Sequence, residues 1–171
     1  MNSPFAYHSC MGLFRFLMLL ALAVWLGALI FFPAVAQISF TVLPSTHLAG
    51  LVVRNSLIAL HWMGFVSGIV FLACSLIYNR LALGRFRAPA MSHILVIIML
   101  ALTAISQFRI IPRMDALRLS AGEIAALPAG NPIRAEFDSL HAWSTRIEGA
   151  MLILGLLVLY SVARRFSTSR L

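Results

Sequence analysis

The chain has 171 residues, of which 61% are hydrophobic, and its charged residues are thirteen arginines and five acids, with no lysine. This composition excludes a separate soluble domain, because the longest polar stretch, residues 112–140, is too short to bury a core of its own. The net charge of +8 does not indicate nucleic-acid binding, since the arginines lie at the ends of apolar segments and not in a basic stripe with interleaved aromatic residues.

Four long apolar segments follow one another, and each approaches or exceeds the roughly 18–20 residues that cross a bilayer as a helix. The sequence predicts helices at approximately residues 11–37, 51–79, 91–112 and 132–165. The first segment could alternatively be a signal sequence, because Ala34-Val35-Ala36 resembles a cleavage site, but its length and the adjacent Phe31-Phe32-Pro33 argue against this. We therefore expect one all-α domain, a four-helix transmembrane bundle in contact with the lipid bilayer.

The distribution of arginine predicts how the helices are oriented. Residues 79–90 and the tail after the fourth segment contain arginines and no acid: Arg80, Arg85, Arg87, Arg164, Arg165 and Arg170. Cytoplasmic loops carry an excess of basic residues, so this pattern predicts that both termini are cytoplasmic (N-in/C-in). The third connection conflicts with this orientation, because it contains Arg113, Arg118 and Arg134, although acidic residues accompany them.

The third connection is also expected to contain a short helix. Apolar residues recur there at helical spacing, which is typical of a helix lying in the external membrane interface. They are Met114, Leu117, Ala121 and Ile124. Asn131-Pro132 then resembles a capping residue followed by a proline in the first helical turn. The fourth helix would extend from there for about 50 Å, so its first turns should project into the external aqueous phase.

Polar residues gather at one end of the predicted bundle. His61 lies seven residues after Arg54, on the same face of the second segment. In the fourth segment a polar stripe leads into an otherwise apolar helix. Its members are His141, Ser144, Thr145 and Glu148. Since the second and fourth helices both begin outside in an N-in orientation, the two histidines should lie at similar depth.

The third segment brings Gln107 and Arg109 to the same level. A carboxylate inside the membrane edge needs either a cation or a proton. We therefore expect a polar cluster of Arg54, Arg109, Ser144 and Glu148, in which one of the two arginines lies within salt-bridge reach of Glu148.

Three interpretations of His61 and His141 stay open. The histidines can be structural and bond neighbouring helices, or they can hold a transition metal or a haem, because imidazole binds zinc, copper and iron. Together with Glu148 they can also form a proton or solute path. Cys10 and Cys74 are far apart in the sequence and form no metal motif.

Several segments, taken in order, resemble a known family. They are Trp25-Leu26-Gly27-Ala28-Leu29-Ile30-Phe31-Phe32, Ala49-Gly50, Leu60-His61, Ile111-Pro112-Arg113-Met114 and Phe137-x-x-x-His141-x-x-Ser144. Together they are similar to the transmembrane-protein-205-like family, known in bacteria as domain of unknown function 4149. The resemblance covers nearly the whole chain and implies a four-helix integral membrane protein without an established activity. Glu148 stands where a polar amide is expected in that family.

More distantly, the first helix with its W-x-G motif is similar to the copper-resistance D membrane domain. It is also similar to small four-helix haem-linked protoporphyrinogen oxidases, but the histidine that these carry in helix one has no counterpart here. We predict a non-enzymatic protein of the bacterial cytoplasmic (inner) membrane that assists metal or solute handling, or the assembly of a membrane complex. Its expected partners are the lipid bilayer and either a second copy of itself in a homo-oligomer or another membrane-complex subunit. The alternative is a haem- or copper-linked membrane redox protein that uses His61 and His141.

Overall fold

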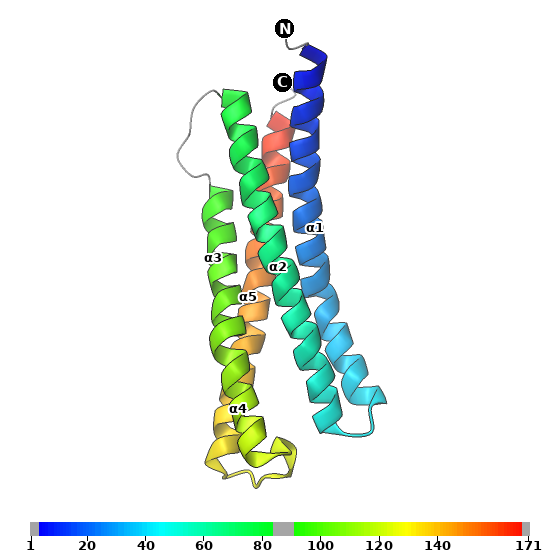
Figure 1. The fold of residues 1–171 in the computed structure, drawn as a ribbon, viewed down its shortest axis with the longest axis vertical. Helices are drawn as coiled ribbons and strands as arrows, with labels where there is room; N and C mark the ends of the chain where they lie inside the picture. Colours follow the sequence, from blue (N-terminus) through cyan, green and yellow to red (C-terminus); the bar gives the residue numbers. More distant parts are fainter. Residues whose placement is uncertain (1–3, 84–90, 169–171) are drawn as a thin grey trace.

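The computed structural model describes the backbone of residues 4–83 and 91–168, and the side chains of residues 11–81 and 91–164. Its elements are α1 (Pro4–Val42), α2 (Thr46–Leu83), α3 (Met91–Ile105), η1 (Ser106–Ile110), α4 (Ile111–Ala121), η2 (Ile124–Ala126) and α5 (Pro132–Thr168) (Figure 1). Within these residues four helices are long and apolar enough to cross a membrane: Met11–Val42, Thr46–Leu81, Met91–Ala121 and Pro132–Arg164. The predicted all-α, four-helix transmembrane bundle is confirmed, and the chain is a multi-pass membrane protein.

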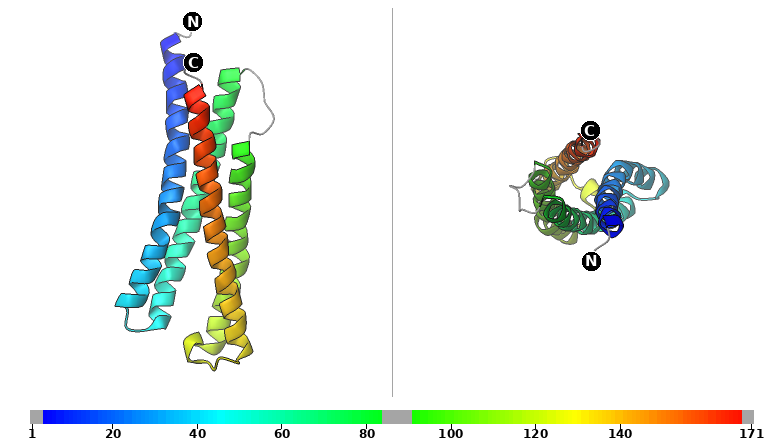
Figure 2. Two further views of the ribbon diagram at one scale, coloured as in Figure 1. Left: turned by 180° about the vertical axis from the view of Figure 1, so that it is seen from behind. Right: turned by 90° about the horizontal axis from the view of Figure 1, so that it is seen from above.

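The long helices form a ring in which each packs against the next. Seen from above, α1 lies beside α2, α2 beside α3, α3 beside α5 and α5 beside α1 (Figure 2). The start of α1 and the end of α5 lie at one end of the bundle, and the α1–α2 turn and the α4–α5 connection lie at the other (Figure 1). Towards this second end the α1–α2 hairpin diverges from α4 and α5 (Figures 1 and 2).

The interior of the ring is a closely packed apolar core. Its fully buried side chains include Leu22, Trp25, Phe71, Val96, Met99, Met151 and Val158. Gly64 makes room for Trp25, because a Cβ atom at this glycine would lie 2.6 Å from the indole nitrogen. Such close approach at small residues is typical of membrane helices. Gly27 and Gly149 do not have this role, because a Cβ atom at either would have nothing within 4 Å.

The third membrane helix is longer than predicted. We expected it to end near residue 112 and a separate helix to follow, but α3, η1 and α4 continue as one span to Ala121. The π-helical turn η1 explains the continuity. The Ile111 N–H bonds to the Ser106 carbonyl, and Pro112 then falls in the first turn of α4, where its missing N–H is tolerated. Met114 and Leu117 are buried, so this segment packs on the bundle.

Two other helices also begin or end beyond the predicted bounds, and α5 begins where expected. Near the end of α1 the Ser39 hydroxyl donates to the Val35 carbonyl at 2.8 Å, and the helix continues to Val42. α2 begins at Thr46, where Ser45 Oγ accepts from the Leu48 N–H. At the start of α5, Asn131 Oδ1 accepts from the Ile133 N–H at 2.9 Å, as its capping role predicts.

Arg15 and Tyr78 mark one edge of the apolar region. Arg15 Nε donates to the Tyr78 hydroxyl at 3.0 Å, and both residue types favour the membrane interface. The hydrocarbon layer is about 30 Å thick, or about 20 residues of α-helix. The second edge therefore crosses α2 near Ile58. Of the arginines used to predict the orientation, Arg85, Arg87 and Arg170 lie outside the described residues, as does the side chain of Arg165.

Candidate functional site

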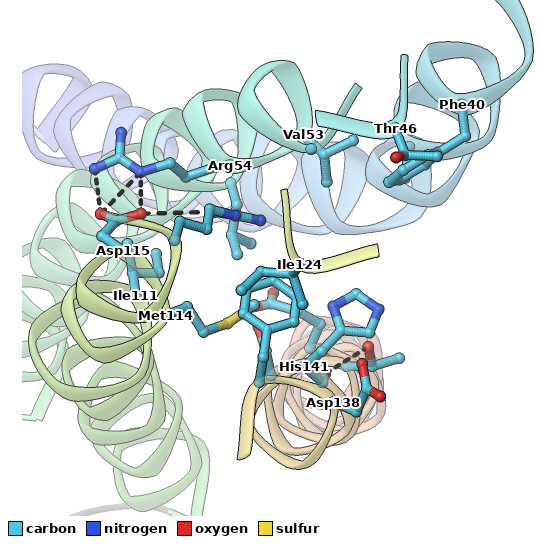
Figure 3. A pocket seen from close by; sticks show the side chains of 18 of the residues that line it. Phe40, Thr46, Val53, Arg54, Ile111, Met114, Asp115, Ile124, Asp138 and His141 are labelled. Carbon is cyan, nitrogen blue, oxygen red and sulfur yellow. Dashed lines mark hydrogen bonds and ion pairs between the residues drawn. The ribbon is translucent and has the colours of Figure 1, made fainter. Parts of the chain in front are cut away.

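A pocket of about 660 Å³ lies where the α1–α2 hairpin diverges from α4 and α5 (Figure 3). The α1 side of the pocket is apolar and consists of Leu29, Phe32, Pro33, Ala36 and Phe40. The facing sides on α2, α4 and α5 supply charged and polar residues: Arg54, Asp115, Arg118, Asp138, His141, Ser144, Thr145 and Glu148. A single molecule in the pocket would therefore contact an apolar surface on one side and a polar surface on the other.

At the deep end of the pocket, His61 joins three helical segments. The His61 side chain is fully buried, with 0% exposed. Its Nδ1 lies 2.9 Å from Gln107 Oε1 of η1, and its Nε2 lies 2.9 Å from Glu148 Oε1 of α5. Glu148 lines the pocket and is 13% exposed. Its other oxygen, Oε2, is buried and has no hydrogen-bond partner among the described residues. We call these three residues the triad.

The height of the triad relative to the membrane follows from its neighbours. His61 is one helical turn further along α2 than Ile58, so it lies about one turn inside the membrane edge. Arg109 and Arg146 are each two residues from a member of the triad, and both are exposed on the outside of the bundle. Exposed arginines belong at the interface and not in the hydrocarbon, which agrees with this height. The pocket thus spans the membrane–water interface.

The donor and acceptor roles in the triad indicate which of its atoms carry protons. Gln107 Oε1 can only accept, so Nδ1 of His61 carries a proton and donates it. Nε2 of His61 and Oε1 of Glu148 then share a second proton, either as imidazolium and carboxylate or as imidazole and carboxylic acid. Both forms have zero net charge, which suits a buried site, where an uncompensated charge is costly. The triad therefore holds one exchangeable proton at the deep end of the pocket.

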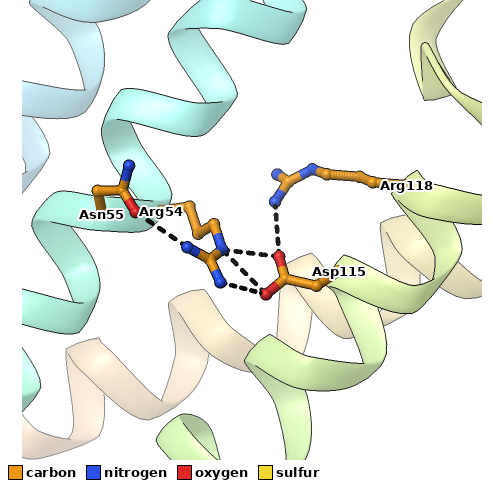
Figure 4. A network of polar contacts seen from close by, with 4 residues as sticks. All are labelled: Arg54, Asn55, Asp115 and Arg118. Atoms are coloured by element: carbon orange, nitrogen blue, oxygen red, sulfur yellow. Dashed lines mark hydrogen bonds and ion pairs between the residues drawn. The ribbon is translucent and has the colours of Figure 1, made fainter.

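Nearer the rim, Asp115 holds two arginines (Figure 4). Arg54 donates to its carboxylate from Nε at 2.7 Å and from Nη2 at 2.5 Å, and Arg118 Nη1 lies 3.6 Å from Oδ1. The Arg118 guanidinium also lies 4.9 Å from the centre of the Phe137 ring. It reaches Gly50, where a Cβ atom would be 3.4 Å from Nη2. These contacts connect α2, α4 and α5 beside the pocket.

The rim itself is held by weaker polar contacts. Thr46 Oγ1 donates to Glu123 Oε1 at 3.2 Å, which connects α2 to the α4–α5 connection. Arg134 Nη1 donates to the Leu127 carbonyl at 2.7 Å, and its Nε lies 3.9 Å from Asp138. All three arginines that line the pocket are therefore paired with protein groups, whereas Oε2 of Glu148 has no hydrogen-bond partner in the part of the chain that the structure describes.

The structure brings some of the predicted site residues together. His61 and Glu148 are in direct contact, and Ser144 is buried one turn from Glu148 on the same side of α5. His141 also lines the pocket, but it is exposed and closer to the rim, one turn after Asp138 on α5 (Figure 3).

The expected arginine partner of Glu148 is a wrong prediction. Arg54 pairs with Asp115, and Glu148 pairs with His61. Arg109 is exposed on the outside of the bundle. The physical reason is that guanidinium groups extend towards water when they can, while a histidine can share a proton with the carboxylate in the buried position.

Gln107 and Asp115 are the site residues whose roles the sequence did not reveal. Gln107 was placed at the right level but without a partner. Asp115 lies in the third connection, and no site role was predicted for it. The sequence did contain a signal for the Arg54–Asp115 pair. Arg54 lies at the start of the second apolar segment and Asp115 follows the end of the third, so two antiparallel helices bring both residues to the same end of the bundle.

The described residues do not fit a haem or copper centre at His61 and His141. Imidazole ligates a metal through a ring nitrogen, and both ring nitrogens of His61 are engaged, by Gln107 and by Glu148. Across the side chains that the structure describes, there is no group of three or more His, Cys, Asp or Glu residues that could hold a metal ion. Cys74 is buried, and the side chain of Cys10 lies outside the described residues.

Fold and pocket together define a class: a multi-pass membrane protein with a mixed-polarity pocket at one end of a four-helix bundle. The chain belongs to the family described as domain of unknown function (DUF4149), whose model matches residues 20–123. The matched segment contains His61, Gln107 and Asp115, whereas Glu148 on α5 lies beyond it. No curated protein and no solved structure matches the chain. The resemblances to transmembrane protein 205 and to the copper-resistance D domain therefore stay predictions.

Proposed function

We propose that this protein is a solute-binding membrane protein, not an enzyme, and that it takes up an amphiphilic small molecule in the pocket between the α1–α2 hairpin and α4–α5. We place it in the bacterial cytoplasmic membrane with both termini inside, so that the pocket opens on the external side. The observation that carries the proposal is the pocket of about 660 Å³, with one apolar and one polar side, at the membrane–water interface.

The volume and the lining support a small-molecule site. Ligand pockets are typically about 300–1,000 Å³ and combine apolar surface with a few polar groups. An amphiphilic molecule at the membrane–water interface has an apolar part and a polar part. Phe32 and Phe40 would contact the apolar part, and the polar residues of α5 would contact the other.

The closed inner end supports binding over conduction. Beyond the triad the ring is filled by buried apolar side chains such as Trp25, Met99 and Met151. A solute that enters from the external side meets this core, so the pocket has one open end. Passage through the protein would require the helices to separate. If the protein handles a solute, as the sequence predicts, the first step is binding of that solute in the pocket.

A blocking substitution tests the proposal. Ala36→Trp adds an indole to the apolar side of the pocket, whereas Ala34→Trp adds it to an exposed position of α1 that does not line the pocket. The protein in lipid nanodiscs would be given 4-phenylbutylamine, 4-phenyl-1-butanol and 4-phenylbutyrate, which share one apolar body. We expect at least one of them to raise the unfolding temperature of the wild type and of Ala34→Trp, but not that of Ala36→Trp. No shift with any of the three would contradict the proposal.

A further inference from the structure

We propose that the solute is a cationic amphiphile, an amine with an apolar body, and that its ammonium group replaces the proton held by the triad of Gln107, His61 and Glu148. This inference rests on the proposed binding function and specifies the chemical class of the solute. It also specifies what the protein releases when the solute binds.

The first argument is the balance of charged groups around the pocket. Its lining contains four carboxylates and three guanidinium groups: Asp115, Glu123, Asp138 and Glu148 against Arg54, Arg118 and Arg134. The guanidinium groups are engaged with Asp115, the Leu127 carbonyl and Asp138. An anionic head group would have to compete for them, whereas a cation can take the place of the proton that neutralises Glu148 in the triad.

The second argument is the unbonded oxygen of Glu148. Oε2 is buried and accepts no hydrogen bond from any described residue, and the Glu148 side chain lines the pocket. A buried acceptor without a donor costs roughly 1–3 kcal/mol, so a donor that reaches it gains this energy back. An ammonium group provides both the N–H donor and the positive charge. Because Leu29 and Leu152 also line the pocket, an apolar body can follow the head group.

The exchange of proton and cation balances at the atomic level. Before binding, His61 carries a proton on Nδ1, and a second proton is shared between Nε2 and Glu148 Oε1. When the ammonium donates to Glu148, one of these two protons leaves to water. The remaining proton sits on Nε2 and is donated to the carboxylate. The Gln107 amide turns over and donates its NH₂ to Nδ1. The pocket gains one positive charge and loses one, so the buried site stays neutral.

Other charged groups near the pocket do not supply this exchange. α1 contributes no titratable residue to the lining, and α2 contributes His47 at the rim and Arg54, which is bonded to Asp115. On α4 and the connection that follows it, the lining contains Asp115, Arg118 and Glu123, and on α5 it contains Arg134, Asp138 and His141. Asp115 and Arg118 are half-buried, but both already take part in ion pairs. Arg134 is bonded to the Leu127 carbonyl, and the remaining groups, His47, Glu123, Asp138 and His141, are exposed. The triad is the buried group among them, because His61 is fully inaccessible.

The experiment uses the three phenylbutyl compounds with the full-length protein in lipid nanodiscs. Calorimetric titrations in two buffers of different ionisation enthalpy give the number of protons released per ligand. We expect the amine to bind at least about tenfold more tightly than the alcohol, as a charged hydrogen bond allows, and to release up to one proton. Because binding releases a proton, the affinity for the amine should increase with pH, by up to about tenfold per pH unit. The affinity for the alcohol should not change.

Two variants separate this mechanism from a general effect of charge. Glu148→Gln keeps the size and hydrogen-bonding capacity of the side chain but removes its charge. It should abolish both the preference for the amine and the release of the proton. Glu136→Gln is the matched control, because Glu136 is on the same helix, is bonded to Arg113 and does not line the pocket. It should behave as the wild type.

The outcomes distinguish the two proposals. If the alcohol or the butyrate binds as well as the amine, the pocket binds amphiphiles but the cation–proton exchange is wrong. The exchange is also wrong if Glu148→Gln still releases a proton. If none of the compounds binds, the proposed function itself fails. Preferential binding of the amine with proton release, lost only in Glu148→Gln, would establish the exchange.

Discussion

A carboxylate about one turn inside the membrane edge requires a cation or a proton, and Glu148 obtains its partner from His61. An arginine in this place would keep a permanent charge in a nearly dry site. Histidine instead shares one proton with the carboxylate, so the contact is neutral in either form. Gln107 completes the arrangement, because its amide can accept from or donate to the other ring nitrogen. Three side chains that are individually costly to bury are therefore acceptable together.

Substitution of the two main members of the triad should have unequal effects on stability. His61→Leu leaves both the Gln107 amide and the Glu148 carboxyl group without their partner and should cost about 2–4 kcal/mol. Glu148→Leu leaves only Nε2 of His61 without a partner and should cost about 1–2 kcal/mol. The measurement is reversible unfolding in mixed detergent micelles. The double variant should lose less than the sum of the single losses. Strictly additive losses would show that the two side chains do not interact.

The helices could be predicted from hydrophobicity alone, but their bounds could not. The long apolar runs predicted four spans, and Asn131-Pro132 predicted the start of α5 correctly. The third helix was expected to end near residue 112, and a proline at this position removes a donor and clashes with the preceding turn of a regular helix. The π-helical turn η1 avoids this clash by bonding Ile111 back to Ser106. A π turn leaves no simple pattern in a sequence, so the continuous span to Ala121 could not be inferred.

The packing of α1 on α2 depends on the glycine opposite Trp25. Gly64→Ala would place a methyl group 2.6 Å from a rigid indole ring, and the ring or the helix must shift. We expect a loss of about 1–3 kcal/mol in the free energy of unfolding. Gly27→Ala is the control, because its Cβ would have nothing within 4 Å. It should be neutral or slightly stabilising, since alanine favours helix more than glycine does. Equal effects of the two substitutions would contradict the packing described here.

At the scale of the whole molecule, the sequence indicated which residues share a depth but not the shape that they surround. The antiparallel order of the helices places Arg54, His61, Gln107 and Glu148 at one end of the bundle, and this followed from the order of the segments. The divergence of the α1–α2 hairpin from α4 and α5 (Figure 2) did not follow, because the hydrophobic and charge patterns of the segments do not define the angles between the helices. The pocket is a consequence of that divergence. Partner choice within the polar cluster, such as Arg54 with Asp115, depends on the same geometry.

The orientation of the molecule determines which compartment the pocket serves, and it can be tested by cysteine labelling. The α1–α2 turn and the α4–α5 connection lie at the same end of the bundle as the pocket (Figure 1). Pro44 and Gly130 are exposed in these two connections. In a background without Cys10 and Cys74, Pro44→Cys and Gly130→Cys should react with an impermeant maleimide added to intact cells.

A cysteine at Ala88, next to Arg87, should react only after the cells are permeabilised, because basic loops are retained in the cytoplasm. The arginines of the third connection oppose this orientation, but all three are paired with carboxylates: Arg113 with Glu136 at 2.6 Å, Arg118 with Asp115 at 3.6 Å and Arg134 with Asp138 at 3.9 Å. Labelling of Ala88→Cys from outside, with protection of Pro44→Cys and Gly130→Cys, would reverse the orientation. The pocket would then draw its solute from the cytoplasmic side, and the proton released on binding would enter the cytoplasm.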